Sequence, residues 1–138
     1  MRTHVLDASA LYRFITKGDG SHLVDDLFKQ SATTGTPVLI SAVNWGEVYY
    51  SLVKRAGLVK TDNMMAEMVT RVPITLAAAT PDDAVRAARL KAQYNLPYAD
   101  CFAAALTGTQ HVLVTADVDH FTRVPKLRLL KLPQAKRS

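Results

Sequence analysis

The sequence predicts an α/β domain with a central, mainly parallel sheet that is covered by helices on both faces. Short runs of β-branched and aliphatic residues alternate with segments of helical periodicity along the chain. Strands that alternate with helices favour a parallel sheet. Hydrophobic residues make up 49% of the 138 residues, which is enough for one full core. We therefore predict a single domain over residues 1–132, followed by a short basic C-terminal tail over residues 133–138.

In the N-terminal half, two β-rich runs are expected to alternate with four helices. The runs consist mainly of Val, Leu and Ile, and the helical segments have apolar residues three or four positions apart. Turns at Gly18, Gly35 and Gly57 separate the segments, and Ser41 is a suitable cap for the third helix. In chain order the expected elements are a strand over 4–6, helices over 8–15 and 21–32, a strand over 38–40, and helices over 42–56 and 58–71.

The C-terminal half continues the alternation and contains the strongest helix-start signal. Thr80 is a capping residue, Pro81 fits the first helical position, and Asp83 stands where a capping box places an acid. Asn95 and Pro97 then interrupt the helical pattern. In chain order the expected elements are a strand over 72–76, helices over 81–94 and 98–106, a strand over 112–115, a turn with a short helix over 117–123, and a strand over 127–132.

Composition narrows the class of protein. The single cysteine, Cys101, rules out a disulfide within the chain and disfavours a cysteine-based zinc site, so a reducing compartment such as the cytoplasm is expected. No apolar run approaches the roughly 18 residues of a membrane span, and Asp7 interrupts any signal-peptide core at the start. The 17 basic residues outnumber the 12 acids, which favours a polyanionic partner.

Acidic residues follow the predicted strands. Asp7 comes directly after the first strand, and Asp117 lies two residues beyond the strand over 112–115. Glu47 lies in the helix after the second strand, and Asp100 lies in the first turn of the helix that starts at residue 98. Asp119 follows Asp117 by two residues. Because ligands bind at the carboxyl ends of parallel strands, we expect these carboxylates to converge at one edge of the sheet.

Each acid also has an ordinary structural interpretation. Asp7 could cap a helix, Glu47 could face solvent, and Asp100 could complement a helix dipole.

A cluster of these acids has a different implication. Clustered carboxylates repel one another, and burial raises their pKa unless a cation joins them. Mg²⁺ and Mn²⁺ prefer such oxygen ligands, and two of these ions can promote phosphodiester cleavage. Without these five acids, seven acids face 17 basic residues, which suits a metal-dependent nuclease that holds phosphates on a basic body.

Four segments together resemble the motifs of the PIN-domain family, in the family's order and spacing and over essentially the whole chain. They are Val5-Leu6-Asp7-Ala8-Ser9-Ala10, residues 41–48 with Glu47, residues 96–104 with Asp100, and residues 113–121 with Asp117 and Asp119. The resemblance implies a PIN-like three-layer α/β/α sandwich. A PIN protein of this size is similar to the VapC ribonuclease toxins of VapBC toxin–antitoxin pairs.

The resemblance implies an endoribonuclease that hydrolyses RNA with metal-activated water. Asp7, Glu47, Asp100 and Asp117 would hold Mg²⁺ or Mn²⁺, with Asp119 as a further or alternate ligand. Ser9 and Thr115 would orient ligands or water through hydrogen bonds. His120 is inserted before Phe121, which leaves open whether Asp117 or Asp119 is the closer ligand.

The partners follow from the resemblance, whereas the substrate contacts are expected from charge and from position near the site. A cognate antitoxin and a homodimer are expected, with Met64, Met65, Met68, Tyr49 and Tyr50 in the core or at the dimer surface. The expected RNA contacts are Arg13, Lys17, His120 and Arg123.

Other functions remain open. They are a PIN nuclease of RNA processing or decay without a toxin role, and a non-catalytic RNA-binding PIN module. A Mg²⁺-dependent phosphatase would need an Asp-x-Asp motif, which Asp7-Ala8-Ser9 does not supply.

Overall fold

Five parallel strands form the centre of the fold. The computed structural model describes residues 2–133. Within them the sheet has the order β3–β2–β1–β4–β5, and each neighbouring pair of strands is parallel. The strands are β1 (His4–Leu6), β2 (Val38–Ser41), β3 (Ile74–Ala77), β4 (Val112–Thr115) and β5 (Arg128–Lys131). The parallel sheet expected from the alternation of strands and helices is confirmed.

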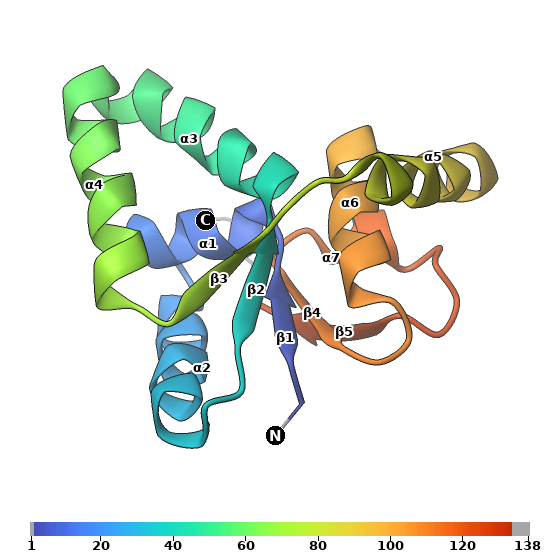
Figure 1. Cartoon of the computed structure of the whole chain (residues 1–138), viewed down its shortest axis with the longest axis horizontal. Coiled ribbons are helices and arrows are strands. Elements are labelled where there is room, and N and C mark those ends of the chain that lie inside the picture. The colour runs from blue at the N-terminus through green and yellow to red at the C-terminus, as the bar shows by residue number, and fades with distance from the viewer. Residues whose placement is uncertain (1, 134–138) are drawn as a thin grey trace, which may run out of the picture.

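Helices cover both faces of this sheet (Figure 1). Alternate residues of a strand point to opposite faces, so Leu6 and Val114 pack in one apolar cluster, and Val5 and Leu113 pack in another. The first cluster includes residues from the first four helices, and the second includes residues from α5 and α6. The three-layer architecture is therefore confirmed. The helices are α1 (Ala8–Ile15), α2 (Ser21–Thr34), α3 (Ala42–Ala56), α4 (Leu58–Arg71), α5 (Pro81–Tyr94), α6 (Tyr98–Thr107) and α7 (Val118–Phe121).

The capping signals in the sequence act as predicted. Ser41 caps α3 by accepting a hydrogen bond from the Val43 N–H, and Thr80 and Asp83 form a reciprocal capping box at the start of α5. Several strand boundaries differ from the prediction by one or two residues, and the start of β3 differs most. The strand expected from residue 72 begins at Ile74, because the Val72 N–H ends α4 by bonding to Met68 O and Pro73 has no N–H to pair.

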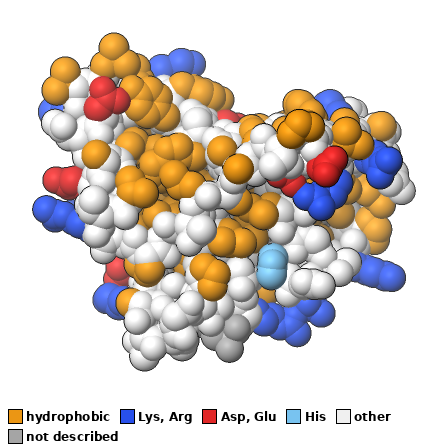
Figure 2. Space-filling model, in the orientation of Figure 1, with side chains coloured by type: hydrophobic (Ala, Val, Ile, Leu, Met, Phe, Trp, Pro, Cys, Tyr) orange, Lys and Arg blue, Asp and Glu red, His pale blue; other side chains and the backbone are white. Residues whose placement is uncertain are grey.

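The side chains on one face of the molecule are distributed unevenly. Figure 2 shows hydrophobic side chains gathered between the α3–α4 pair and α5, whereas most Lys and Arg side chains lie around the outline of the molecule in this view. Among the described helices, none is both long and apolar enough to cross a bilayer. Of the predicted basic tail over 133–138, only Pro133 falls within the described residues.

Candidate active site

The acids gather where the direction of chain winding reverses. From β1 the chain proceeds through β2 to β3 on one side, and β4 and β5 lie on the other side. Asp7 follows β1, and Asp117 lies two residues after β4, so both stand at the carboxyl ends of two adjacent strands. Such a reversal leaves a crevice beyond the strand ends, which is the usual ligand site in open parallel sheets.

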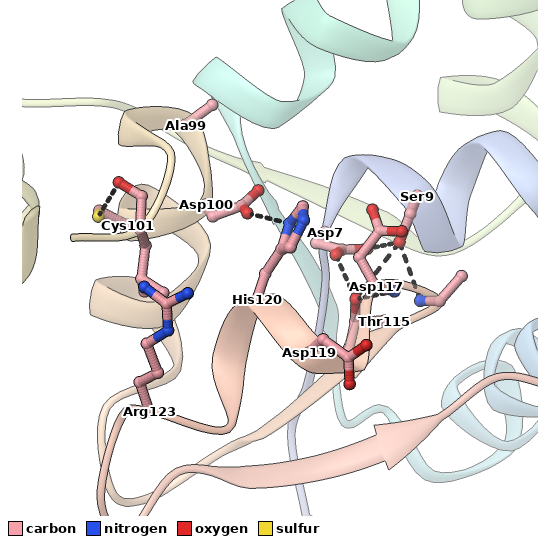
Figure 3. A network of polar contacts seen from close by, with 12 residues as sticks. Asp7, Ser9, Ala99, Asp100, Cys101, Thr115, Asp117, Asp119, His120 and Arg123 are labelled. Carbon is pink, nitrogen blue, oxygen red and sulfur yellow. Dashed lines mark hydrogen bonds and ion pairs between the residues drawn. The ribbon is translucent and has the colours of Figure 1, made fainter. Parts of the chain in front are cut away.

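Asp7 is held by a network of short hydrogen bonds (Figure 3). Ser9 Oγ donates to Asp7 Oδ1 at 2.6 Å, and Thr115 Oγ1 donates to Asp7 Oδ2 at 2.6 Å. The Ala10 N–H also donates to Oδ1 at 2.9 Å, which makes Asp7 the N-cap of α1. Both interpretations of Asp7 thus apply, since it caps a helix and also lies among the other acids.

The two hydroxyls of this network also hold the loop after β4. Ser9 Oγ accepts from the Ala116 N–H at 2.9 Å, and Thr115 Oγ1 accepts from the Asp117 N–H at 2.8 Å. The backbone that carries Asp117 is therefore fixed relative to Asp7. Ser9 and Thr115 lie where an orienting role requires them.

Asp7 is almost fully buried, with 2% of its surface exposed. Burial raises its pKa from 3.8 to about 6, although the bonds from Ser9, Thr115 and the Ala10 N–H oppose the rise. The negative charge of Asp117 raises the pKa further. A buried carboxylate with a second one nearby is a position that a cation would stabilise.

Glu47 extends from α3 toward the crevice beyond the strand ends, and Asn44 orients its carboxylate. Asn44 Nδ2 donates to Glu47 Oε1 at 2.9 Å and to Ala99 O at 3.1 Å. Asn44 is fully buried, so it links the middle of the site to the first turn of α6, beside Asp100. Burial raises the pKa of Glu47, the Asn44 bond lowers it, and the charges of Asp100 and Asp117 raise it.

Asp100 lies in the first turn of α6 and pairs with His120. His120 Nδ1 lies 2.7 Å from Asp100 Oδ2. Burial raises the pKa of Asp100, the neighbouring His120 lowers it, and Asp117 raises it. In Figure 3, His120 stands between Asp100 and the Asp7 network. The inserted histidine therefore contacts one of the acids directly.

Asp117, rather than Asp119, belongs to the cluster of acids. The charge of Asp117 raises the pKa of Asp7, Glu47 and Asp100. Asp117 and Glu47 also line a cleft of about 280 Å³ that opens over Ser9. The Asp119 carboxylate points away from the Asp7 network in Figure 3. The sequence left open whether Asp117 or Asp119 is the closer ligand, and this geometry favours Asp117.

The donor set fits a hard cation with an incomplete set of protein ligands. Within residues 2–133, no three Asp, Glu, His or Cys side chains are close enough together to enclose one metal ion. The acids are nevertheless coupled through space, and burial disfavours the charged forms of Asp7, Glu47 and Asp100. Mg²⁺ is often bound through only one or two carboxylates, and water and phosphate oxygens complete its shell.

The four residues predicted to contact RNA do not lie together in the structure. Arg13 Nη1 donates to Asp19 O at 2.9 Å and to Pro133 O at 2.8 Å, so it fastens the α1–α2 loop to the chain after β5. Arg123 Nη1 makes long bonds to carbonyls at the end of α5, with 3.4 Å to Tyr94 O. Lys17 lines a different hollow, formed by α1, α2 and α4. Of the four predicted contacts, only His120 reaches the acids.

The site also contains Asn44, which the sequence motifs did not point to. It lies three positions before Glu47, a spacing that places two side chains on the same face of a helix. A polar amide next to Trp45 and Val43, on a helix that starts directly after a strand, was the available signal. Its second bond, to Ala99 O across 55 residues, could not be anticipated locally.

Comparison with known proteins agrees with this architecture. A chain in the crystal structure of VapBC2 from Rickettsia felis, bound to a promoter DNA fragment, has a TM-score of 0.75 and 16% identity, covering 94% of this chain and 98% of that one. DNA-bound VapBC from Salmonella typhimurium has a TM-score of 0.73 and 17% identity, covering 95% and 98%. VapC20 from Mycobacterium tuberculosis, a sarcin–ricin-loop-cleaving toxin, has a TM-score of 0.66 and 17% identity, covering 91% and 99%. These likenesses show a shared fold.

Sequence comparisons add a family assignment. A search of curated proteins found no significant match. The sequence model of the PIN domain matches residues 4–127, which include all the acids of the cleft. This chain therefore belongs to the PIN-domain family.

Proposed function

We propose that this protein is a divalent-metal-dependent endoribonuclease and the toxin of a VapBC-type pair. The observation that carries the proposal is the gathering of four carboxylates near the carboxyl edge of the sheet. Asp117 raises the pKa of Asp7, Glu47 and Asp100, although the four acids come from four separate segments of the chain. PIN nucleases generally use divalent metal ions, and this donor set suits Mg²⁺ or Mn²⁺.

Each residue has a separate task in this proposal. Asp7, Glu47, Asp100 and Asp117 hold the ion or ions directly or through water. When bound, the ion activates water for attack on phosphorus and neutralises charge on the phosphate. Ser9 and Thr115 keep both oxygens of Asp7 fixed, and Asn44 keeps Glu47 turned toward the cleft. Such supporting hydrogen bonds orient ligands and tune their basicity.

An RNA substrate is supported by the balance of charge and by the relatives. The cleft is acidic while the chain as a whole carries a net charge of +5, so the net charge favours a polyanion and a metal ion would offset the repulsion between the acids and a phosphate. A similar chain from Mycobacterium tuberculosis belongs to a toxin that cleaves the sarcin–ricin loop. We propose hydrolysis of an RNA phosphodiester bond in the cytoplasm.

We further propose that an antitoxin restrains the enzyme, as in the similar VapBC complexes. A hollow of about 660 Å³, lined by both apolar and charged residues in and beside α1, α2 and α4, lies at the far end of α1 from Asp7. Phe14, Met64 and Met68 line it, and charged residues including Asp25 and Arg71 surround them. This combination fits an amphipathic segment of a partner protein. A homodimer is also proposed, with exposed Leu58 and Val59 as available apolar contacts.

The decisive experiment is cleavage of total cellular RNA by purified protein, free of antitoxin, with Mg²⁺ or Mn²⁺. We expect cleavage that stops on addition of EDTA and falls at least about 100-fold in Asp7→Asn, because loss of a supporting residue alone reduces activity 10- to 100-fold. Asp26→Asn, on the exposed face of α2, is the matched control and should cleave normally.

Two outcomes would contradict the proposal. Cleavage that survives both EDTA and Asp7→Asn would point to a contaminating nuclease or a different chemistry. A folded protein that binds RNA and never cleaves it, with either metal, would favour a non-catalytic binding module. Co-purification with the product of a small adjacent gene separates a toxin from a nuclease of RNA processing.

A further inference from the structure

Helix α3 presents an acid, an aromatic ring and a cation in succession along one face. Glu47 and Tyr50 are three positions apart, and Lys54 follows Tyr50 by four, so all three lie on neighbouring turns. Glu47 and Tyr50 both line the acidic cleft, together with Asp117. Lys54 Nζ lies over the Tyr50 ring, 5.8 Å from its centroid. Moving outward from the acids along α3, a ligand would therefore meet an aromatic ring and then a positive charge.

Tyr50 makes little contribution to the packing of the fold. Its side chain is 54% exposed, and it belongs to neither apolar cluster. The neighbouring Tyr49 differs in both respects. It packs against the first cluster, and its hydroxyl donates to Asp62 Oδ1 at 2.6 Å, which joins α3 to α4. Tyr49 therefore has a structural role, whereas the Tyr50 ring is available to a ligand at the rim of the cleft.

The spacing along α3 suits a single nucleotide step. At about 1.5 Å per residue, Tyr50 lies about 4.5 Å along the helix from Glu47, and Lys54 lies about 6 Å further. Exposed aromatic rings beside a charged groove are the usual platforms on which unpaired bases stack, and lysines there contact phosphates. The acids would act on one phosphate while the ring and the cation engage the adjoining nucleotide.

We propose that Tyr50 stacks on an unpaired RNA base adjacent to the bond that is cut, and that Lys54 contacts the following phosphate. This inference rests on the proposed nuclease function and adds two substrate-contacting residues of this chain, Tyr50 and Lys54. A base that is paired within a helix cannot present its face to the ring. Stacking tolerates any base, so the contact selects RNA structure rather than sequence.

The test compares two labelled 12-mers by fluorescence anisotropy, an oligoadenylate and an oligomer of the same length with abasic riboses. Both carry the same phosphates, so only the first can stack. Ca²⁺ replaces Mg²⁺, because it occupies oxygen sites and activates water poorly. We expect the wild-type protein to bind the oligoadenylate roughly tenfold or more tightly than the abasic oligomer.

Three variants distinguish the contribution of the Tyr50 ring to RNA binding from that of the Lys54 charge. Tyr50→Leu should bind both oligomers equally, whereas Tyr50→Trp should keep the preference because it keeps an aromatic face. Lys54→Gln should weaken both oligomers to a similar extent and lower the salt dependence of binding by about one ion. Melting temperatures check that all variants are folded.

The proposal is overturned by specific outcomes. These are a Tyr50→Leu protein that keeps the preference, and a wild-type protein that binds both oligomers equally or neither of them. If Tyr50→Leu instead abolishes self-association in analytical ultracentrifugation and leaves RNA binding unchanged, the ring belongs to a protein interface. The nuclease proposal is judged separately, because metal-dependent cleavage and its loss in Asp7→Asn do not depend on Tyr50.

Discussion

The two ends of helix α1 differ in almost every physical respect. At its N-terminal end, Asp7 is buried beside a cleft of about 280 Å³ that Glu47 and Asp117 line. At its C-terminal end, Phe14 and Ile15 line a hollow of about 660 Å³ with Met64 and Met68. The smaller cleft has the clustered acids, and the larger hollow is the surface that we propose for a protein partner. Volume alone would have selected the other end of α1 as the candidate site.

The two ends are also stabilised differently. The acidic end is held by hydrogen bonds that partly offset the burial of charge, and the pKa of Asp7 remains raised to about 6. The apolar end is held by packing, including an edge-to-face contact between Phe14 and Phe28 with ring centroids 5.0 Å apart. The acidic end is therefore a source of instability in the absence of a cation, whereas the apolar end is stabilising. The predictions below test this contrast.

The largest expected effect concerns the stability of the metal-free protein. The pKa of Asp7 is about 6 in the folded protein against 3.8 for an unperturbed group. Its favourable contribution is therefore fully present below about pH 4 and is lost as the pH rises through 6. A rise of about two pKa units corresponds to about 3 kcal/mol. Asp7→Asn, which cannot ionise, should be more stable than wild type by about that amount at pH 7.5.

Urea unfolding in EDTA between pH 4 and 7.5 measures this difference. The advantage of Asp7→Asn should shrink toward zero as the pH approaches 4, where wild-type Asp7 is protonated in both states. Asp26→Asn again serves as the control and should show no such trend. Equal stability of wild type and Asp7→Asn at pH 7.5 would mean that the buried charge is compensated within the protein.

The next variant perturbs the acidic site at the N-terminal end of α1 without removing an acid. Asn44→Ala removes the amide that orients Glu47 and joins α3 to α6. We expect the Mn²⁺ concentration needed for half-maximal cleavage to rise 10- to 100-fold, the range for loss of a supporting partner. Asn63→Ala, on the exposed face of α4, is the control. An unchanged Mn²⁺ dependence in Asn44→Ala would show that Glu47 needs no support.

A third prediction tests the apolar end. Met64→Lys places a charge in the hollow between α1, α2 and α4 and should weaken antitoxin binding roughly tenfold or more. Val69→Lys lies on the same helix but outside the hollow, and it is 47% exposed, so it should bind normally. Calorimetric titration with the purified antitoxin measures both. Similar affinity for the two variants would place the antitoxin elsewhere.

The smallest expected effect distinguishes the two neighbouring acids. Asp119→Asn should change kcat/KM by no more than about twofold, as is usual for a surface substitution. Asp117→Asn should reduce kcat/KM by about 100-fold or more, because its carboxylate lies in the cleft with Glu47. An Asp119→Asn protein as inactive as Asp117→Asn would identify Asp119 as a ligand of the ion and would revise the site.

The sequence by itself determined the local structure and the kinds of group at the site. The capping box at Thr80 and Asp83 and the Ser41 cap depend on residues within three positions of each other, so they could be read directly. Strand β3 began two residues later than expected because Pro73 cannot pair. The acids could be assigned to one edge because parallel strands end on the same side of a sheet.

Only the tertiary structure decided which of these groups meet. The order of strands places β4 beside β1, so Thr115 bonds to Asp7 across 108 residues of sequence. The same packing brings Asn44 to α6, turns Asp117 rather than Asp119 into the cleft, and commits Arg13 to the backbone at Pro133. Local patterns specify backbone conformation over a few residues. Contacts between distant segments depend instead on how the two faces of the sheet bury their apolar side chains, which local patterns do not specify.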